Sequence, residues 1–494
     1  MVPFLALHLD RRSSLPLQRQ LYDEIRAAIL SGRLAPGVRL PATRGLAADA
    51  RISRNTVCGA FDQLLAEGYL EGKAGSGTYV AKTLPEELLR VTRQAMPARA
   101  PRVSALLSQR GRLLAATRTA RADGIAVPHA FQPGVPAFDQ FPRVLWARMA
   151  ARILRHAPAA LLTYGEPAGY RPLRQAIAEY LRAARGVRCS ADQVIVTSGS
   201  QQALDLAARV LLDPGDAAWV EDPGYLGARA ALLAAGVRCV PVPIDSEGLS
   251  VAAGEARAPN ARLACVTPSH QYPLGVTMPL GRRMKLLDWA RRSGAWIVED
   301  DYDSEFRYAG RPLPALQGLD TAGRVVYTGT FSKVLLPALR LGYLVPPEPL
   351  VDAFVSARAL ADRHSPALEQ ALTAEFLSEG YFGRHVRRMR ALYAERQEAL
   401  VAAARNELAG LLEVEPAEAG LQLVGWLPKS LSDRAVSERA AKAGIIAAPI
   451  SAYAMQAKLR PGLRLGYAPV NPRQIRDGVL RLAAVLATTA AGAS

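Results

Sequence analysis

The sequence is poor in cysteine and has no long apolar run, and each of these shortages excludes a class of protein. The four cysteines among 494 residues, Cys58, Cys189, Cys239 and Cys265, lack the spacing of a disulfide framework or a metal site, so we expect reduced thiols and no metal. No run approaches the roughly 20 apolar residues of a membrane span, and the first residues lack a signal peptide's basic start and apolar core. We therefore expect a cytoplasmic protein with no membrane partner.

Basic charge is plentiful and unevenly distributed. The formal net charge is +17, of which the first 125 residues carry about +9 and the much longer remainder about +8. The total alone fits an anionic partner and an arginine-rich composition equally well, but its concentration near the N-terminus favours DNA as the partner of that end. At roughly 100–200 residues per domain, the chain is long enough for two or three domains.

The N-terminal end has the pattern of a winged helix-turn-helix, which we place at residues 12–82. Apolar residues recur at helical spacing and are followed by stop signals, and two β-type runs then flank a glycine-rich tip. The predicted elements are helices over residues 17–31, 43–50 and 54–67 and strands over 69–71 and 78–80.

The start of the third predicted helix is the candidate DNA-reading turn. Ser53 is placed to cap this helix, and the apolar stripe that begins at Val57 is expected to be buried. This leaves Arg54, Asn55 and Thr56 exposed in the first turn, where they would face DNA.

The rest of the chain divides into a linker and an α/β domain. Residues 83–125 are rich in Arg, Ala, Pro and Ser with poor periodicity, so we interpret them as a linker. Over 126–490, apolar strand-like runs alternate with helical ones, which predicts a mainly parallel sheet covered by helices and a smaller C-terminal subdomain. The strand-like runs cover residues 194–196, 217–220, 263–266, 296–298 and 325–327.

Two polar clusters follow strand-like runs, where functional groups gather in open α/β sheets. Thr197–Gln202 opens a helix with hydroxyls and a glycine, which is typical of a phosphate cradle and also of an ordinary helix cap. Glu299–Glu305 offers a carboxylate for a protonated pyridine nitrogen and the Tyr302 hydroxyl for a ring oxygen. A solvated acidic loop or a metal site is the alternative.

Two further clusters contain isolated cations. Lys333, one of only seven lysines, follows Thr330 and Ser332 and precedes Arg340, so it combines an amine for a Schiff base with groups for a phosphate. The apolar run after it disfavours a surface lysine. Arg464 lies in an apolar strand-like run and requires a carboxylate, for which the sequence favours a structural Asp or Glu over a ligand.

With these motifs the chain resembles one family over nearly its whole length. Leu40–Arg44, Ser53–Val57 and Gly75–Thr78 resemble the GntR-type winged helix, and the chain from about residue 126 resembles a fold-type I, class I aminotransferase. This fusion resembles the MocR/GabR family of pyridoxal-phosphate-dependent transcriptional regulators.

The resemblance implies the cofactor pyridoxal 5'-phosphate and a role for each matching position. Lys333 would form the internal aldimine, Asp300 would pair with the pyridine nitrogen, Tyr302 would contact the ring oxygen and Tyr225 would stack on the ring. The other implied contacts are Ser200, Gln201, Thr330, Ser332 and Arg340 around the phosphate, Tyr164 on the phosphate of the partner subunit in a homodimer, Arg464 on a ligand carboxylate, and Arg44, Arg54, Asn55, Thr56 and Gly75 on DNA.

Two positions depart from the relatives' pattern. Tyr272, which follows His270 and Gln271, replaces the asparagine of the aminotransferases' Asn-Pro-Thr-Gly, and MocR-like regulators commonly have His-Gln here. Gly227 stands where the γ-aminobutyrate-responding member has an arginine that helps to hold its ligand. We therefore do not expect γ-aminobutyrate as the effector.

Together these features favour a transcription regulator that is nucleoid-associated when bound to a double-stranded operator. It would sense an amine or amino-acid effector by aldimine exchange at Lys333, because differential affinity for two conformations shifts the DNA-bound population. Two alternatives stay open. One is an active aminotransferase with an appended DNA-binding module, in which Lys333 removes the Cα proton, and the other is a regulator whose signal is pyridoxal phosphate itself.

Overall fold

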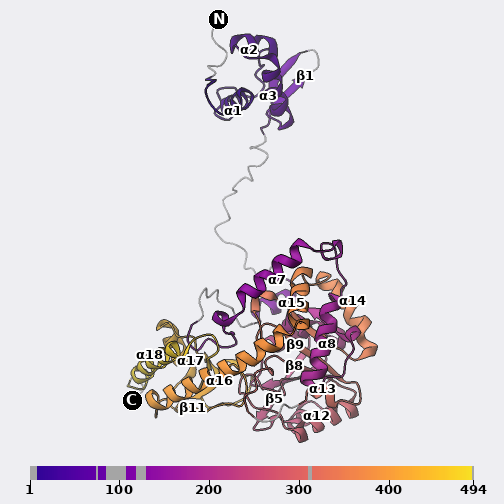
Figure 1. The fold of residues 1–494 in the computed structure, drawn as a ribbon, viewed down its shortest axis with the longest axis vertical. Coiled ribbons are helices and arrows are strands. Elements are labelled where there is room, and N and C mark those ends of the chain that lie inside the picture. Colours follow the sequence, from indigo (N-terminus) through magenta and orange to yellow (C-terminus); the bar gives the residue numbers. More distant parts are fainter. Residues whose placement is uncertain (1–7, 74–75, 85–106, 118–128, 310–313, 492–494) are drawn as a thin grey trace. The chain divides into compact units, whose positions relative to one another are not determined.

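The chain forms two compact units, Met1–Leu106 and Leu107–Ser494, which Figure 1 shows as a ribbon. Each unit has a hydrophobic core of its own, as expected for separate domains. The computed structural model describes residues 8–73, 76–84, 107–117, 129–309 and 314–491.

The first unit consists of three helices and a β-hairpin. Leu21, Ile25 and Phe61 from the helices and Val80 from the hairpin are almost fully buried in one core, which explains why the helical spacing of apolar residues predicted these helices. The hairpin strands are antiparallel. The elements are α1 (Leu17–Leu30), α2 (Thr43–Asp49), α3 (Arg54–Ala66), β1 (Leu70–Lys73) and β2 (Gly77–Val80). The predicted winged helix-turn-helix is confirmed.

An eight-stranded, mainly parallel sheet forms the centre of the second unit. Its strand order is β3-β10-β9-β8-β7-β4-β5-β6, and β5, β4, β7, β8 and β9 run parallel, whereas β10 is antiparallel to both of its neighbours. Because parallel strands end at the same edge, polar residues after β4, β7, β8 and β9 are brought together. The strands are β3 (Ile195–Thr197), β4 (Ala217–Asp222), β5 (Arg238–Asp245), β6 (Gly248–Leu249), β7 (Leu263–Val266), β8 (Trp296–Asp301), β9 (Val325–Thr330) and β10 (Gly342–Val345).

Helices cover both faces of this sheet. Ala218, Val220 and Val298 pack with α9, α10 and α14 on one face, whereas Trp219 and Ile297 pack with α11 and α12 on the other, as the alternation of side chains along a strand requires. The helices of this layer and its surroundings are α6 (Gln109–Ala116), α7 (Arg143–Arg155), α8 (Arg171–Arg185), α9 (Ser200–Leu211), α10 (Leu226–Ala234), α11 (Val251–Arg257), α12 (Leu280–Ser293), α13 (Leu316–Leu319), α14 (Val351–Asp362) and α15 (Ala367–Ser378).

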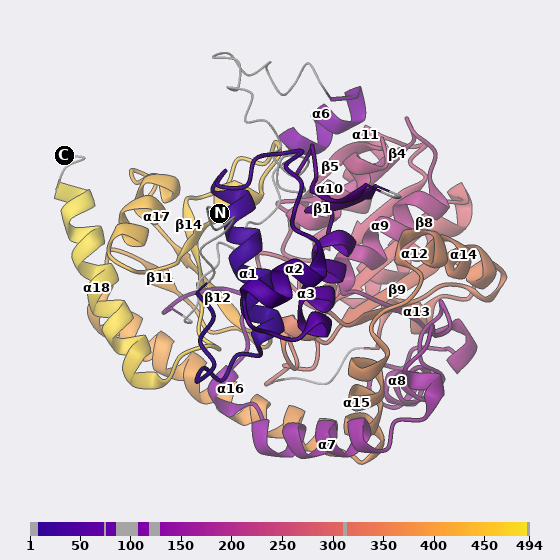
Figure 2. The same ribbon diagram turned by 90° about the horizontal axis from the view of Figure 1, so that it is seen from above.

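A smaller C-terminal subdomain follows the long helix α16 (Tyr381–Glu407). Its antiparallel sheet has the order β11-β12-β14-β13, and α16 packs against α18; Figure 2 shows this group at one side of the second unit. The elements are β11 (Glu413–Val414), β12 (Gln422–Trp426), α17 (Asp433–Lys442), β13 (Ala448–Pro449), β14 (Gly462–Gly466) and α18 (Pro472–Ala491). Within the described residues, no helix has both the length and the apolar character needed to cross a membrane.

The predicted α/β fold is confirmed, and the predicted strands differ from the observed ones mainly in length. Four of the five predicted runs lie within β4, β7, β8 and β9, and the run 194–196 is displaced by one residue from β3. The prediction did not include β5, which contains Pro241 and Pro243, residues that argue against a strand because they lack an N–H group.

Candidate functional site

Lys333 lies just beyond the carboxyl end of β9. Its Nζ donates a hydrogen bond to the carbonyl oxygen of Gly134 at 2.9 Å, and a Cβ added to Gly134 would lie 3.1 Å from that Nζ. Gly134 also has a φ of 71°, so both its conformation and its contact favour glycine. Burial lowers the pKa of the Lys333 amine, while Asp303 and Asp300 oppose this shift. A lowered pKa increases the neutral, nucleophilic form of the amine.

Asp300 is a buried carboxylate near this amine, at the end of β8. The residue is 4% exposed, and its Oδ1 has no hydrogen-bond partner among the described residues. Burial raises the pKa of Asp300 to about 7, Asp301 and Glu221 add to this rise, and Lys333 opposes it. A buried oxygen without a partner is costly, and a protonated ring nitrogen would satisfy it. The residue therefore fits a cationic pyridine nitrogen.

The neighbouring acidic residues are also buried, so the interpretation of Glu299–Glu305 as a solvated loop is wrong. Asp301 Oδ2 accepts hydrogen bonds from Arg185 Nε at 2.9 Å and from the Tyr327 hydroxyl at 2.6 Å. Asp303 lies beside His270. In the described ranges, no group of three or more His, Cys, Asp or Glu residues is arranged to hold a metal ion. The carboxylates of Asp301 and Asp303 are thus held by partners within the protein.

Arg340 and Gly199 form a candidate anion site at the start of α9. Gly199 has a φ of 100°, and a Cβ added to it would lie 3.3 Å from Arg340 Nη2. Arg340 Nη2 donates to the Ser198 carbonyl oxygen at 2.7 Å, so the guanidinium lies beside the N-terminus of the helix, where backbone amides favour an anion. Arg340 itself has a φ of 48°, an unusual conformation for a residue with a side chain.

The sheet register brings the other predicted phosphate residues to this place. Gly342 of β10 pairs with Thr197 at the end of β3 and with Thr330 at the end of β9. The turns that follow these two strands are therefore neighbours. One turn leads into α9 through Ser200 and Gln201, and the other contains Ser332, whose N–H donates to the Thr330 hydroxyl at 3.1 Å.

Arg464 in β14 is buried and has no ion pair with a described carboxylate, so the expected structural partner is wrong. Its guanidinium carbon lies 4.6 Å from the ring centroid of Tyr272 and 5.0 Å from that of Tyr453, and its Nε and Nη1 have no hydrogen-bond partner in the described residues. Burial lowers the pKa of Arg464 to about 9, and Tyr225 opposes this shift. Two aromatic faces thus hold a guanidinium whose Nε and Nη1 are available to a carboxylate.

Tyr272 lies at the centre of a cluster of tyrosine rings. Its ring centroid is 5.4 Å from that of Tyr225, 5.8 Å from that of Tyr302 and 5.4 Å from that of Tyr453, and each pair is nearly edge-on. Such pairs stabilise a fixed arrangement of the rings. The residue that departs from the aminotransferase pattern therefore organises the aromatic side of the site.

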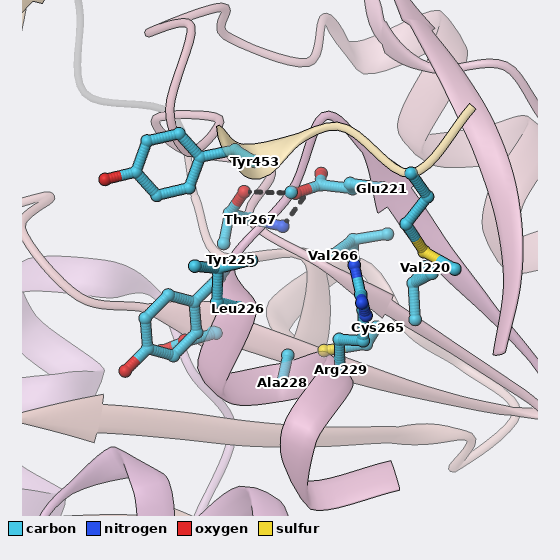
Figure 3. A pocket seen from close by; sticks show the side chains of 13 residues that line it. Val220, Glu221, Tyr225, Leu226, Ala228, Arg229, Cys265, Val266, Thr267 and Tyr453 are labelled. Carbon is cyan, nitrogen blue, oxygen red and sulfur yellow. Dashed lines mark hydrogen bonds between the residues drawn. The ribbon is translucent and has the colours of Figure 1, made fainter. Parts of the chain in front are cut away.

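Tyr225 links the groups predicted for the ring, the phosphate and the carboxylate. Burial raises its pKa to about 12, Asp300 adds to this rise, and Arg340 and Arg464 oppose it, so all three charges act on this ring. Tyr225, Tyr453, Glu221 and Thr267 line a cavity of about 20 Å³. This volume is enough for about one water molecule. Figure 3 shows these residues and the hydrogen bonds between Glu221 and Thr267.

Tyr164 lies on the surface, away from the other predicted cofactor residues. It is 76% exposed, and its ring contacts the Arg363 guanidinium at 4.7 Å and the His364 ring at 6.2 Å between centroids. The structure therefore does not bring Tyr164 into the group around Lys333 of its own chain.

Several residues of the site had no predicted role. Gly134 receives the Lys333 hydrogen bond, and Tyr453 holds one face of Arg464. Asp222, which lies two residues after a predicted strand, accepts hydrogen bonds from the backbone N–H groups of residues 455–457 at 2.6, 2.8 and 2.9 Å. Only the position of Asp222 after an apolar run was a usable signal, because these partners are distant in sequence.

The candidate DNA-reading turn is exposed in the first unit. Arg54 and Asn55 are exposed in the first turn of α3, and Arg44 is exposed in the first turn of α2. Thr56 is only partly exposed, because its N–H donates to Ser53 Oγ at 3.0 Å and its hydroxyl lies 2.8 Å from the same atom. The structure thus assigns Thr56 to the helix cap as well. Gly75 lies outside the described residues.

The hairpin adds exposed cations to this unit. Lys73 lies with its Nζ 4.8 Å from the ring centroid of Tyr79, and the Tyr79 hydroxyl lies 2.7 Å from Ser76 Oγ. A Cβ added to Gly77 would lie 3.0 Å from Arg39 Nε, so Arg39 crosses the same hairpin. An arginine and a lysine are therefore held on the wing.

Comparison with protein families assigns both units. Residues 131–482 match the aminotransferase class I and II family, and residues 17–80 match the bacterial regulatory proteins of the gntR family. The first match covers the sheet, the helices around it and most of the C-terminal subdomain, and the second covers the three helices and the hairpin.

Individual proteins show the same combination. The chain is 46% identical over 490 residues to the probable rhizopine catabolism regulatory protein MocR of Rhizobium meliloti, covering 99% of this chain and 97% of that protein. It is 34% identical over 403 residues to the HTH-type pyridoxine biosynthesis transcriptional regulator PdxR of Corynebacterium glutamicum, covering 80% and 79%. The crystal structure of the α-aminoadipate aminotransferase LysN of Thermus thermophilus, complexed with N-(5'-phosphopyridoxyl)-L-leucine, matches with a TM-score of 0.73 and 32% identity, covering 79% of this chain and 100% of that chain.

Proposed function

The chain belongs to the MocR family of transcriptional regulators, in which a GntR-type DNA-binding unit is fused to an aminotransferase-like unit, and we propose that it senses an amine-bearing effector at Lys333. The observation that carries this proposal is the Asp300 oxygen, which is buried near that amine and has no partner within the described part of the chain. Pyridoxal phosphate, when bound, supplies an aldehyde that condenses with the Lys333 amine and can exchange that bond for the amine of an effector.

The residues around Lys333 would hold this cofactor by its three kinds of groups. Asp300 would keep the ring nitrogen protonated, Tyr302 would donate to the ring oxygen, and Tyr225 would stack on the ring face. The phosphate would lie at the start of α9, where Arg340 crosses the helix N-terminus. The other phosphate contacts we propose are Ser200, Gln201, Thr330 and Ser332.

Arg464 supports an amino acid as the effector. Its Nε and Nη1 and its two aromatic neighbours suit a bidentate carboxylate, which would lie beside the ring because Arg464 is near Tyr225. Gly227 argues against γ-aminobutyrate. A Cβ added there would lie 2.3 Å from Gln201 Oε1 and 2.5 Å from the Tyr225 ring, so a side chain at this position would displace both residues.

The regulatory output requires a dimer and DNA contacts. The exposed Tyr164 supports a homodimer in which this residue reaches the phosphate of the partner subunit. Arg54, Asn55 and Thr56 of α3, together with Arg44 and Gly75, would contact the operator. Effector binding would then change DNA occupancy through its different affinity for two conformations of the dimer.

A working aminotransferase is the second candidate. The lowered pKa of Lys333 suits removal of a Cα proton, and the similarity to LysN extends over the whole length of that enzyme. A third candidate takes pyridoxal phosphate itself as the signal. Its support is the similarity to the pyridoxine biosynthesis regulator of Corynebacterium glutamicum.

A spectroscopic titration distinguishes these functions. Full-length protein and a Lys333→Ala variant are mixed with pyridoxal phosphate, and the visible absorption is followed while amino acids and amines are added. A band that only the wild type shows, and that one amino acid shifts without bleaching while operator binding changes, supports the proposed sensor. A band that bleaches and returns with a keto acid supports the aminotransferase. Operator binding that follows the cofactor alone supports the third candidate, and absence of the band contradicts the proposal.

A further inference from the structure

His270 contacts Tyr302 in an arrangement to which the proposed function assigns no role. His270 is 3% exposed, and its Nδ1 lies 3.0 Å from the Tyr302 hydroxyl oxygen. The same nitrogen lies 3.0 and 3.1 Å from the two carboxylate oxygens of Asp303, which is 2% exposed. One ring nitrogen therefore faces three oxygens from the segment after β8.

The hydrogen of the neutral imidazole belongs on Nδ1. In that form Nδ1–H donates to Asp303 and lies within reach of the Tyr302 oxygen. In the other form the Nδ1 lone pair would face a carboxylate, and Nε2–H would be a buried donor, although His270 Nε2 has no partner among the described residues. The geometry thus selects the tautomer, as in other sites where a carboxylate fixes a histidine.

Two glycines shape the space around this ring. A Cβ added to Gly420 would lie 2.1 Å from His270 Cε1, and one added to Gly275 would lie 3.2 Å from His270 Nε2. Both glycines have a positive φ, 96° and 81°, which other residues rarely adopt. The imidazole therefore occupies a fitted slot between the loop after β7 and the start of β12.

Tyr302 remains protonated in these surroundings. Burial raises its pKa well above the usual value, and the acidic groups that face it, Asp303, Asp300, Glu221 and Asp301, act in the same direction. Because Nδ1 of His270 already carries a hydrogen, Tyr302 cannot donate to it and can only accept. The hydrogen of Tyr302 is then free for another acceptor.

We propose that Asp303 and His270 act as positioning residues that orient Tyr302 to donate its hydrogen to the ring oxygen of the cofactor. This inference rests on the proposed function, because that oxygen belongs to pyridoxal phosphate. A donor at this oxygen stabilises its anionic form, so the visible band of the Lys333-bound cofactor titrates at a lower pH than it would without the donor.

A pH titration of the visible band tests the arrangement in full-length protein with pyridoxal phosphate. His270→Leu removes the donor, whereas His270→Asn returns an N–H close to the Nδ1 position. We expect H270L to raise the apparent pKa of the band by about one unit, a roughly tenfold change in proton affinity, and H270N to titrate close to wild type. Tyr302→Phe should raise it at least as far, and the double variant H270L/Y302F should match Y302F alone, because His270 acts through Tyr302.

Other outcomes overturn the inference. A wild-type titration curve for H270L, or shifts that add in the double variant, would show that His270 does not act through Tyr302. If H270L fails to fold, Gly420→Ala is the deciding variant, because the added methyl group displaces the imidazole without removing it. We expect this variant to raise the apparent pKa of the band. An unchanged titration curve would count against the inference. Absence of the band in wild type removes the proposed function itself, and the inference with it.

Discussion

Arg54 in the first unit is exposed to solvent, whereas Arg464 in the second is only 6% exposed, and the same contrast holds between the two candidate sites. The first site presents side chains whose polar groups are hydrated until DNA displaces the water. The second consists of buried groups, Asp300 and Arg464, some of whose polar atoms lack a partner within the described residues. An exposed site gains contacts when its partner binds, whereas a buried site is completed by its ligand.

The largest effect expected from this comparison concerns Asp300. Replacing it with alanine would remove the proposed buried partner of the ring nitrogen, and breaking such a pair costs about 3–5 kcal/mol, so cofactor affinity should fall by roughly 100-fold or more. Equilibrium dialysis with pyridoxal phosphate measures this change, and the exposed Asp352→Ala on α14 is the matched control. A loss of less than about fivefold for Asp300→Ala would contradict the role of Asp300 as the buried partner of the ring nitrogen.

Arg464→Met should act on the effector and spare the cofactor. A charge-assisted hydrogen bond contributes about 1.5–3 kcal/mol, so affinity for amino-acid effectors should fall by about 10- to 100-fold. Methionine keeps much of the side-chain length between Tyr272 and Tyr453. Amines without a carboxylate should bind the variant as they bind wild type, and an equal loss for both classes would contradict the assigned role.

Arg54→Ala tests the exposed site. One base or phosphate contact contributes about 1–3 kcal/mol, so operator affinity should fall by about 10- to 100-fold, and the visible cofactor band should be unchanged. Fluorescence anisotropy at several salt concentrations measures the affinity. The salt dependence should weaken if Arg54 contacts a phosphate and stay the same if it contacts a base, and an unchanged affinity would exclude both contacts.

Ligand binding at the buried site should also depend on pH. Burial lowers the pKa of Arg464 to about 9, so its positive charge is present below that pH and is lost above it. Affinity for a carboxylate effector should therefore fall by about tenfold between pH 8 and pH 10. The affinity for an amine without a carboxylate, measured over the same range, is the control for the titration of other groups.

The smallest effect expected is on the stability of the first unit. Ser53→Ala removes the cap that accepts the Thr56 N–H, which should destabilise this unit by about 1 kcal/mol. Ser53→Asp, which keeps an acceptor, is the matched control. Urea unfolding followed by circular dichroism should show the loss in the alanine variant only, and equal curves would mean that the cap does not limit the stability of the unit.

Local patterns in the sequence predicted most of the fold. The apolar spacing along α1 and α3 and the runs in β4, β7, β8 and β9 sufficed, because each element buries one face or both faces in a continuous core. Strand β5 was not predicted because Pro241 and Pro243 give a local signal against a strand, and its pairing with β4 and β6 overrides that signal.

The site was predictable where chemistry follows a strand and unpredictable where it depends on distant neighbours. Lys333 and Asp300 each come within a few residues after an apolar run, so the sheet topology predicts that they meet. The sequence favoured a structural carboxylate for Arg464, and the structure instead places tyrosines from two other loops against it. The contact between His270 and Asp303 likewise joins two loops.

Asp222 gives the site a mechanical property. Lys333 and Asp300 belong to the central sheet, whereas Arg464 and Tyr453 belong to the C-terminal subdomain, and the carboxylate of Asp222 binds three backbone N–H groups next to Tyr453. A ligand whose amine is bound at the cofactor and whose carboxylate is bound by Arg464 would act beside it as a crosslink between the two parts. The free energy of binding such a ligand would then add to that of closing the subdomain onto the sheet.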